Sequence, residues 1–148
     1  MTSRVDFYLL KSQTISTSHH FICKLVDKAY KQKHRIYIHV ADQSQAKLIY
    51  DLLWTFNDIS FVPHNIYSEN NNELAEKTPV LIGYANHNIP CNEILLNLTT
   101  QVPEFFMQFQ RIIEIVPQQN ELQQSGRENY KFYRAQGCEM FTHDLKKN

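Results

Sequence analysis

The stretch that decides the fold is RIIEIVPQQNELQQSGRENYKFYRAQG, residues 111–137. It begins with a run of isoleucine and valine that stops at Pro117, a pattern typical of a buried strand. Asn120 opens a segment of helical character, and Gly137 stands where a helix is expected to end. The stretch therefore predicts a strand followed directly by a helix.

One face of this predicted helix carries two guanidinium groups and a phenol ring. Arg127, Tyr130 and Arg134 are spaced at i, i+3 and i+7, which places them in line along the helix. Lys131 is their neighbour in the sequence. Gly126 lies inside the helix, where glycine costs about 1 kcal/mol relative to alanine, and it indicates close backbone packing. This face suits an acidic, partly apolar ligand, which could be a substrate, a nucleic acid or a peptide.

Strands and helices alternate through the rest of the chain. Four short apolar runs predict strands at residues 5–10, 35–40, 79–84 and 93–98. Amphipathic periodicity predicts one helix after the Ser/Thr cluster at residues 14–18 and another from Ser44. This order predicts the α/β class, with a three-layer α/β/α arrangement and a mostly parallel sheet of about five strands. We expect a single domain over residues 1–148.

Three other segments are less regular. Residues 59–65 are apolar but are broken by Pro63, and residues 68–77 are polar and predict a loop. Proline at the first turn predicts a short helix over residues 103–110. The residues from Cys138 onward are expected to form a short tail.

The composition excludes several classes of protein. The 148 residues include 15 basic and 15 acidic ones, so the chain lacks the surplus of cations that duplex DNA binding needs. Three widely spaced cysteines outside any CxxC pattern indicate reduced thiols rather than disulfides or structural zinc. The N-terminus has no signal-peptide pattern and no apolar run is long enough to cross a bilayer. We therefore expect a cytoplasmic protein that does not bind membranes.

Motifs for catalysis and cofactor binding are absent from the sequence. The three glycines form neither GxGxxG nor GxxxxGK[ST], so we expect a Rossmann-like fold without a phosphate-binding loop. No histidine pair has HExxH or HxH spacing. The sequence therefore predicts no catalytic residue, no cofactor and no metal. Two alternatives stay open: a hydrolase that uses a cysteine and a histidine, and direct binding of single-stranded nucleic acid by Lys24, Lys28 and Lys31.

The order of motifs resembles that of the chi subunit of bacterial DNA polymerase III. The similarity rests on FYLL at residues 7–10, LLW at 52–54, FVPHN at 61–65, VP at 116–117 and RENYKFYRAQG at 127–137. It extends over most of the chain in collinear order. The resemblance implies a non-catalytic replication adaptor, which joins the clamp loader, through the psi subunit, to the acidic C-terminal tail of the single-stranded DNA-binding protein. Nucleic acid would then be bound only indirectly.

The resemblance also implies a site for this tail. A tail of aspartates that ends in Pro-Phe needs cations, a planar group for the terminal carboxylate and an apolar slot for the ring. The positions that match the family pattern are Val116, Arg127, Tyr130, Lys131, Arg134 and Gly137. On pattern alone, Gly137 could simply end the helix, and Lys131 and Arg134 could interact with the helix dipole. Where the family has an aromatic residue after Gly137, this chain has Cys138, so the slot is expected to be shallower or to be filled by Phe141.

An adaptor also needs a second surface for its second partner. Aromatic residues, a proline and little charge are concentrated after the second predicted helix, which is the composition of a protein interface. We hypothesise that the psi subunit binds Trp54, Phe56, Phe61, Val62, Pro63 and His64. The alternative is that Trp54 and Phe61 close the core and Pro63 ends a strand.

Overall fold

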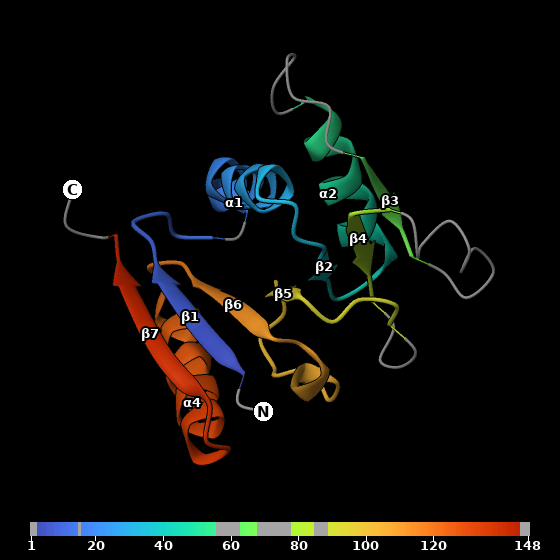
Figure 1. The fold of residues 1–148 in the computed structure, drawn as a ribbon. Coiled ribbons are helices and arrows are strands. Elements are labelled where there is room, and N and C mark those ends of the chain that lie inside the picture. The colour runs from blue at the N-terminus through green and yellow to red at the C-terminus, as the bar shows by residue number, and fades with distance from the viewer. Residues whose placement is uncertain (1–2, 15, 56–62, 68–77, 85–88, 146–148) are drawn as a thin grey trace.

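A parallel β-sheet forms the centre of the computed structural model, which describes residues 3–14, 16–55, 63–67, 78–84 and 89–145. Within these residues the sheet has seven strands in the order β3-β4-β2-β5-β6-β1-β7 (Figure 1). Each pair of neighbouring strands is parallel. The strands are β1 (Arg4–Leu9), β2 (Ile36–His39), β3 (His64–Ile66), β4 (Val80–Gly83), β5 (Ile94–Asn97), β6 (Arg111–Val116) and β7 (Glu139–Asp144).

Helices cover both faces of the sheet. The described helices are α1 (His19–Lys31), α2 (Gln43–Thr55) and α4 (Asn120–Ala135), with short 3-10 turns η1 (Ser16–Ser18) and η3 (Phe106–Gln108). One buried cluster joins α1 and α2 to one face of the sheet, and a second joins α4 and η3 to the other. Figure 1 shows α4 behind β1 and β7, with α1 on the opposite side. The predicted α/β class and three-layer arrangement are confirmed.

The sheet has two more strands than the sequence predicts. β3 begins directly after Pro63 and has only three residues, so it is too short for alternation to be recognised. β7 lies in the segment expected to be a tail, and most of its residues are exposed. An edge strand with this composition lacks the apolar pattern that predicts a buried strand. The short helix predicted at residues 103–110 is also wrong, because only the 3-10 turn η3 forms there.

A buried carboxylate holds the edge strand β7 on the face opposite α4. The Asp6 carboxylate accepts hydrogen bonds from Arg4 at 3.0 and 3.1 Å and from Arg111 at 2.9 Å, and its Oδ1 lies 2.8 Å from His143 Nε2. Burial opposes ionisation of Asp6, but the hydrogen bonds from Arg4 and His143 and the charge of Arg111 outweigh it and lower its pKa. The Arg4 guanidinium also lies 4.2 Å from the centre of the Phe141 ring. These contacts tie β7 to the first and sixth strands.

Alternation along β6 determines which side chains face α4. Ile113 and Ile115 belong to the cluster beneath α1 and α2, whereas Ile112 and Val116 belong to the cluster beneath α4. The parallel register aligns β1 with β6 so that Phe7 is the partner of Glu114 and Leu9 is the partner of Val116. The C-terminal halves of these two strands therefore present side chains to the same helix.

Both ends of α4 have recognisable signals. The Gln119 side chain caps the first turn by accepting a hydrogen bond from the Leu122 backbone N–H at 3.0 Å. Beyond the last turn Gly137 has a φ of 85°, the left-handed conformation that glycine adopts at low cost. The predicted helix and its predicted end are therefore confirmed.

Candidate functional site

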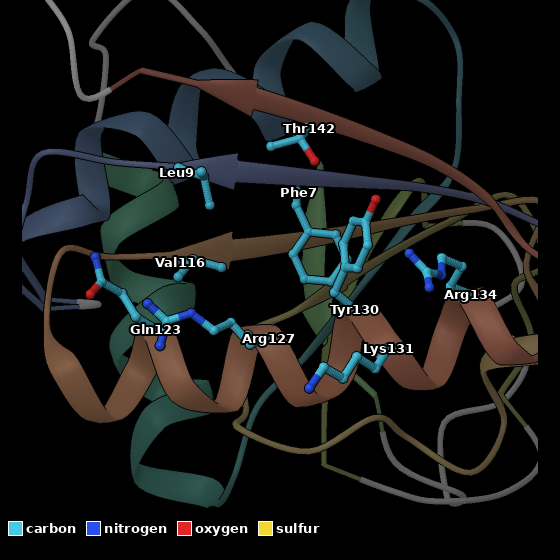
Figure 2. A pocket seen from close by; sticks show the side chains of 10 residues that line it. Phe7, Leu9, Val116, Gln123, Arg127, Tyr130, Lys131, Arg134 and Thr142 are labelled. Atoms are coloured by element: carbon cyan, nitrogen blue, oxygen red, sulfur yellow. The ribbon is translucent and has the colours of Figure 1, made fainter.

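A groove of about 430 Å³ runs between α4 and the strands β1, β6 and β7 (Figure 2). The strands contribute mostly apolar side chains and the helix contributes mostly polar and cationic ones. Its described lining is Phe7, Leu9, Val116, Gln123, Gly126, Arg127, Tyr130, Lys131, Arg134 and Thr142. The groove therefore has a mostly apolar wall on the strand side and three cations on the helix side.

Aromatic contacts shape the apolar part of the groove. The Phe7 ring is buried and lies 5.4 Å from the Tyr130 ring, measured between centroids, with the planes tilted by 60°. Figure 2 shows these two rings side by side between α4 and the strands, with Val116 and Leu9 farther along the groove. A tyrosine in this position offers a flat apolar surface and a hydroxyl group, which suits contact with another ring.

Gly126 allows α4 to approach β6 closely. A Cβ at this position would lie 3.0 Å from Val116 Cγ2 and 3.3 Å from Val116 Cγ1. The close packing that the sequence indicated at Gly126 is therefore confirmed. It brings the helix backbone against the strand and sets the depth of the groove at Val116.

Three cations line the helix side of the groove. Arg127, Lys131 and Arg134 are exposed, and none of them forms an ion pair with a carboxylate in the described part of the chain. Figure 2 shows their side chains along successive turns of α4. An unpaired guanidinium presents a planar fork that fits a carboxylate. The groove can therefore hold an anion while a ring or an aliphatic group contacts its other wall.

A buried hydrogen-bonded carboxyl group lies beneath α4. Tyr133 is fully buried and donates a hydrogen bond of 2.6 Å to Glu114 Oε2, and Asn97 Nδ2 donates another of 2.9 Å to the same oxygen. Burial raises the pKa of Glu114 to about 7, although the two hydrogen bonds act in the opposite direction. Burial likewise raises the pKa of Tyr133.

The groove contains five of the six predicted tail-binding residues. Val116, Arg127, Tyr130, Lys131 and Arg134 line it, whereas Gly137 does not. A Cβ added at Gly137 would have nothing within 4 Å, so its conformation at the helix end explains the glycine there. Whether any of these residues binds a ligand stays a prediction.

Sequence reasoning missed most of the strand side of the lining. Phe7 and Leu9 come from β1. Their i, i+2 spacing indicates that they share one face of that strand, but it does not indicate which face lies toward α4. Thr142 could not be found because β7 was not predicted. Phe141 does not fill the place left by the missing aromatic residue, because its ring lies under Arg4 on the opposite face of the sheet.

The second predicted surface is described only in part. Phe56, Phe61 and Val62 lie outside the described residues. Trp54 is 49% exposed at the end of α2, and its ring centroid lies 4.5 Å from that of His64. Pro63 is exposed, but His64 is buried, and its Nε2 lies 2.9 Å from the Tyr50 carbonyl oxygen. The Trp54 ring therefore remains accessible, and it packs against the buried His64 ring.

The environments of the described cysteines do not favour a nucleophile. Burial raises the pKa of Cys23 to about 11, and burial also raises the pKa of Cys91 and of Cys138. A raised pKa disfavours the thiolate, which is the reactive form. Burial lowers the pKa of His39 to about 4, as expected for a histidine inside the sheet. Among the residues that the structure describes, no group of three or more His, Cys, Asp or Glu side chains could hold a metal ion.

The lysines of the nucleic-acid alternative lie along α1. Lys24, Lys28 and Lys31 are exposed, but Lys31 forms an ion pair of 2.9 Å with Asp27.

No described helix is long and apolar enough to cross a membrane.

Comparison with known proteins gives closely related sequences. The model of the family described as DNA polymerase III chi subunit, HolC, matches residues 1–141. The chain is 32% identical to DNA polymerase III subunit chi of Pseudomonas aeruginosa over 143 residues, which cover 97% of each chain. It is 30% identical to the subunit of the same name from Escherichia coli over 141 residues, which cover 92% of this chain and 94% of that one.

A solved structure shares the fold without sequence similarity. The crystal structure of T4 UvsW matches 96% of this chain and 41% of its own chain, with a TM-score of 0.69 and 10% identity. At this identity the likeness concerns the fold alone. The family match and the near full-length relatives, by contrast, identify the family of this chain. The chain belongs to the DNA polymerase III chi subunit family.

Proposed function

We propose that this protein is a non-catalytic adaptor that links the clamp loader of DNA polymerase III, through the psi subunit, to the acidic C-terminal tail of single-stranded DNA-binding protein. The observation that carries the proposal is the groove along α4, where an apolar wall faces three cations that have no carboxylate partner among the described residues. An acidic peptide that ends in an apolar residue has the complementary chemistry. Capture of such a tail raises the local concentration of the polymerase at coated single strands.

The proposed assignments follow the two walls of the groove. Arg127, Lys131 and Arg134 bind the carboxylates of the tail, and the terminal carboxylate takes one guanidinium fork. Tyr130 and Val116 contact the terminal ring, together with Phe7. Part of the affinity comes from attraction between exposed charges, which salt screens. The affinity therefore falls as the salt concentration increases. The affinity for a peptide without its terminal ring is lower at every salt concentration.

A titration with a labelled peptide of four aspartates followed by Pro-Phe tests this site. Arg127→Ala removes a charge-assisted hydrogen bond worth about 1.5–3 kcal/mol, so we expect the Kd to rise roughly 10- to 150-fold. The matched control is Lys24→Ala, which removes an exposed cation from α1 and is expected to leave the Kd unchanged. Equal affinity of wild type and Arg127→Ala would refute the assignment.

We infer that the psi subunit binds the surface around Trp54. A half-exposed tryptophan supported by a buried histidine is a typical anchor residue of a protein interface. This surface lies at the end of α2, whereas the groove lies on the other face of the sheet beneath α4. Two separate surfaces allow both partners to be held at once, which an adaptor requires.

A further inference from the structure

Glu114 lies directly behind the groove and does not contact the proposed ligand. It is 3% exposed on β6, and Oε2 accepts the hydrogen bonds of both Tyr133 and Asn97. A cavity of about 50 Å³ adjoins the carboxyl group, and Val116 and Gly126 line both this cavity and the groove. Val116 and Gly126 therefore lie between the cavity beside Glu114 and the groove.

Tyr133 connects Glu114 to the aromatic part of the groove. The Phe7 ring lies 5.4 Å from Tyr130, which lines the groove, and 6.1 Å from Tyr133, which does not. Tyr130 and Tyr133 are one turn apart on α4, so the bond from Tyr133 to Glu114 fixes the position of that turn against the sheet. The position of Arg134, the next residue of the helix, is fixed by the same contact.

We propose that Glu114 is a positioning residue of the groove that takes up a proton when an anionic ligand binds, so that the affinity for an acidic peptide rises between pH 8 and pH 6. This inference rests on the proposed function. A carboxylate behind Val116 and Gly126 repels the carboxylates of the ligand, and the neutral carboxyl group does not. Because the coupling is reciprocal, a bound anion favours the protonated form of Glu114 by the same factor.

Among the residues that the structure describes, no second carboxylate lines the cavity beside Glu114. It is the one ionisable side chain among the described residues that line the cavity; the others are Leu98, Thr99, Thr100, Ile115, Val116, Leu122, Ser125, Gly126 and Asn129. From α4 it faces the phenol of Tyr133, from β5 the amide of Asn97, and on β1 its register partner is Phe7. Burial raises its pKa to about 7, within the range in which the proton uptake would be measured.

The described lining of the groove contains no histidine and has only arginine, lysine, tyrosine and uncharged side chains. In model peptides the reference pKa values of arginine, lysine and tyrosine lie well above pH 8, and that of aspartate lies well below pH 6. A change of affinity with pH at constant ionic strength therefore reports on a group outside the direct contacts. Replacement of Glu114 by its uncharged isostere then identifies that group.

The experiment is a titration of the full chain with the peptide of four aspartates and Pro-Phe from pH 6 to pH 8. For wild type we expect the Kd to rise roughly 3- to 5-fold over this range, from the repulsion of charges about 10 Å apart in a screened environment. Glu114→Gln keeps the shape and the two accepted hydrogen bonds but carries no charge. Its Kd is expected to stay near the wild-type value at pH 6 across the whole range.

Tyr133→Phe distinguishes positioning by this hydrogen bond from a merely structural role. Loss of the donor disfavours the ionised carboxylate, so the midpoint of the pH profile is expected to move to higher pH. If Tyr133 only supported the fold, its substitution would weaken binding equally at every pH. Circular dichroism of each variant at pH 6 and pH 8 checks that the comparison concerns folded protein.

Two results would overturn the inference while leaving the adaptor function intact. One is a wild-type Kd that is constant from pH 6 to pH 8, and the other is a Glu114→Gln profile with the wild-type slope. If the peptide does not bind wild type at any pH, the proposed function fails and this inference fails with it. Calorimetry at pH 7 in two buffers of different ionisation enthalpy gives the proton uptake directly, and zero uptake contradicts the proposal.

Discussion

Gly126→Ala tests how tightly α4 is packed on β6. Alanine in a helix interior is favoured over glycine by about 1 kcal/mol, so an unobstructed site would become more stable by that amount. The new Cβ, however, would lie 3.0 and 3.3 Å from the two Val116 methyl carbons, closer than ordinary contact. Overpacking of this kind costs about 1–3 kcal/mol. We therefore expect the free energy of unfolding to fall by about 0–2 kcal/mol.

A double-mutant cycle separates the two contributions. In a Val116→Ala background the obstructing methyl groups are absent, so Gly126→Ala should stabilise the protein by the full ~1 kcal/mol. The coupling energy between the two sites is then about 1–3 kcal/mol, in favour of the double variant. Urea denaturation followed by circular dichroism gives the four free energies that the cycle requires.

The outcome of this cycle is unambiguous. Stabilisation of wild type by about 1 kcal/mol on Gly126→Ala, with no coupling to Val116, would refute the close approach of α4 to β6. The same variant tests the groove, because a helix displaced from Val116 changes the width of the slot. Peptide affinity should therefore decrease in the single variant even if its stability is close to that of wild type.

Two further predictions concern residues outside the groove. Asp6→Asn removes the charge shared by Arg4, Arg111 and His143 and is expected to destabilise the protein by about 2 kcal/mol at pH 7, a value reduced by the exposure of both guanidinium groups. Because the pKa of Asp6 is lowered on folding, this difference should be present above pH 4 and disappear as the pH falls through the folded-state value, which acid titration of both proteins would show. Trp54→Ala should abolish co-purification with the psi subunit and leave the melting temperature nearly unchanged; a large loss of stability would instead place the ring in the core.

The central elements could be predicted because their sequences carry strong local signals. The Arg111–Val116 strand contains four isoleucine or valine residues and is buried on both faces, and α4 has a recognisable beginning and a glycine at its end. In such elements burial, propensity and termination signals agree. The line of Arg127, Tyr130 and Arg134 followed directly from helical spacing, so the cationic wall of the groove could be predicted from the sequence.

The apolar wall could not be predicted, for a physical reason. Phe7 and Thr142 enter the groove only because β1 pairs with both β6 and β7, and this pairing is a property of the tertiary fold. Glu114 shows the same limit, since a single acidic residue in an apolar strand indicates neither of its hydrogen-bond partners. Both partners come from other elements, Asn97 on β5 and Tyr133 on α4.

The position of β1 in the sheet has a consequence for how the protein is made. β1 is synthesised first, yet its partners β6 and β7 begin more than 100 residues later in the chain. Pairing over such separations is slow, because a long loop must close before any contact stabilises it. On the ribosome, β1 therefore stays unpaired until β6 and β7 have emerged. The groove, which needs β1, β6, α4 and β7 together, forms only after β7 has been synthesised, and a chain released before that point lacks it.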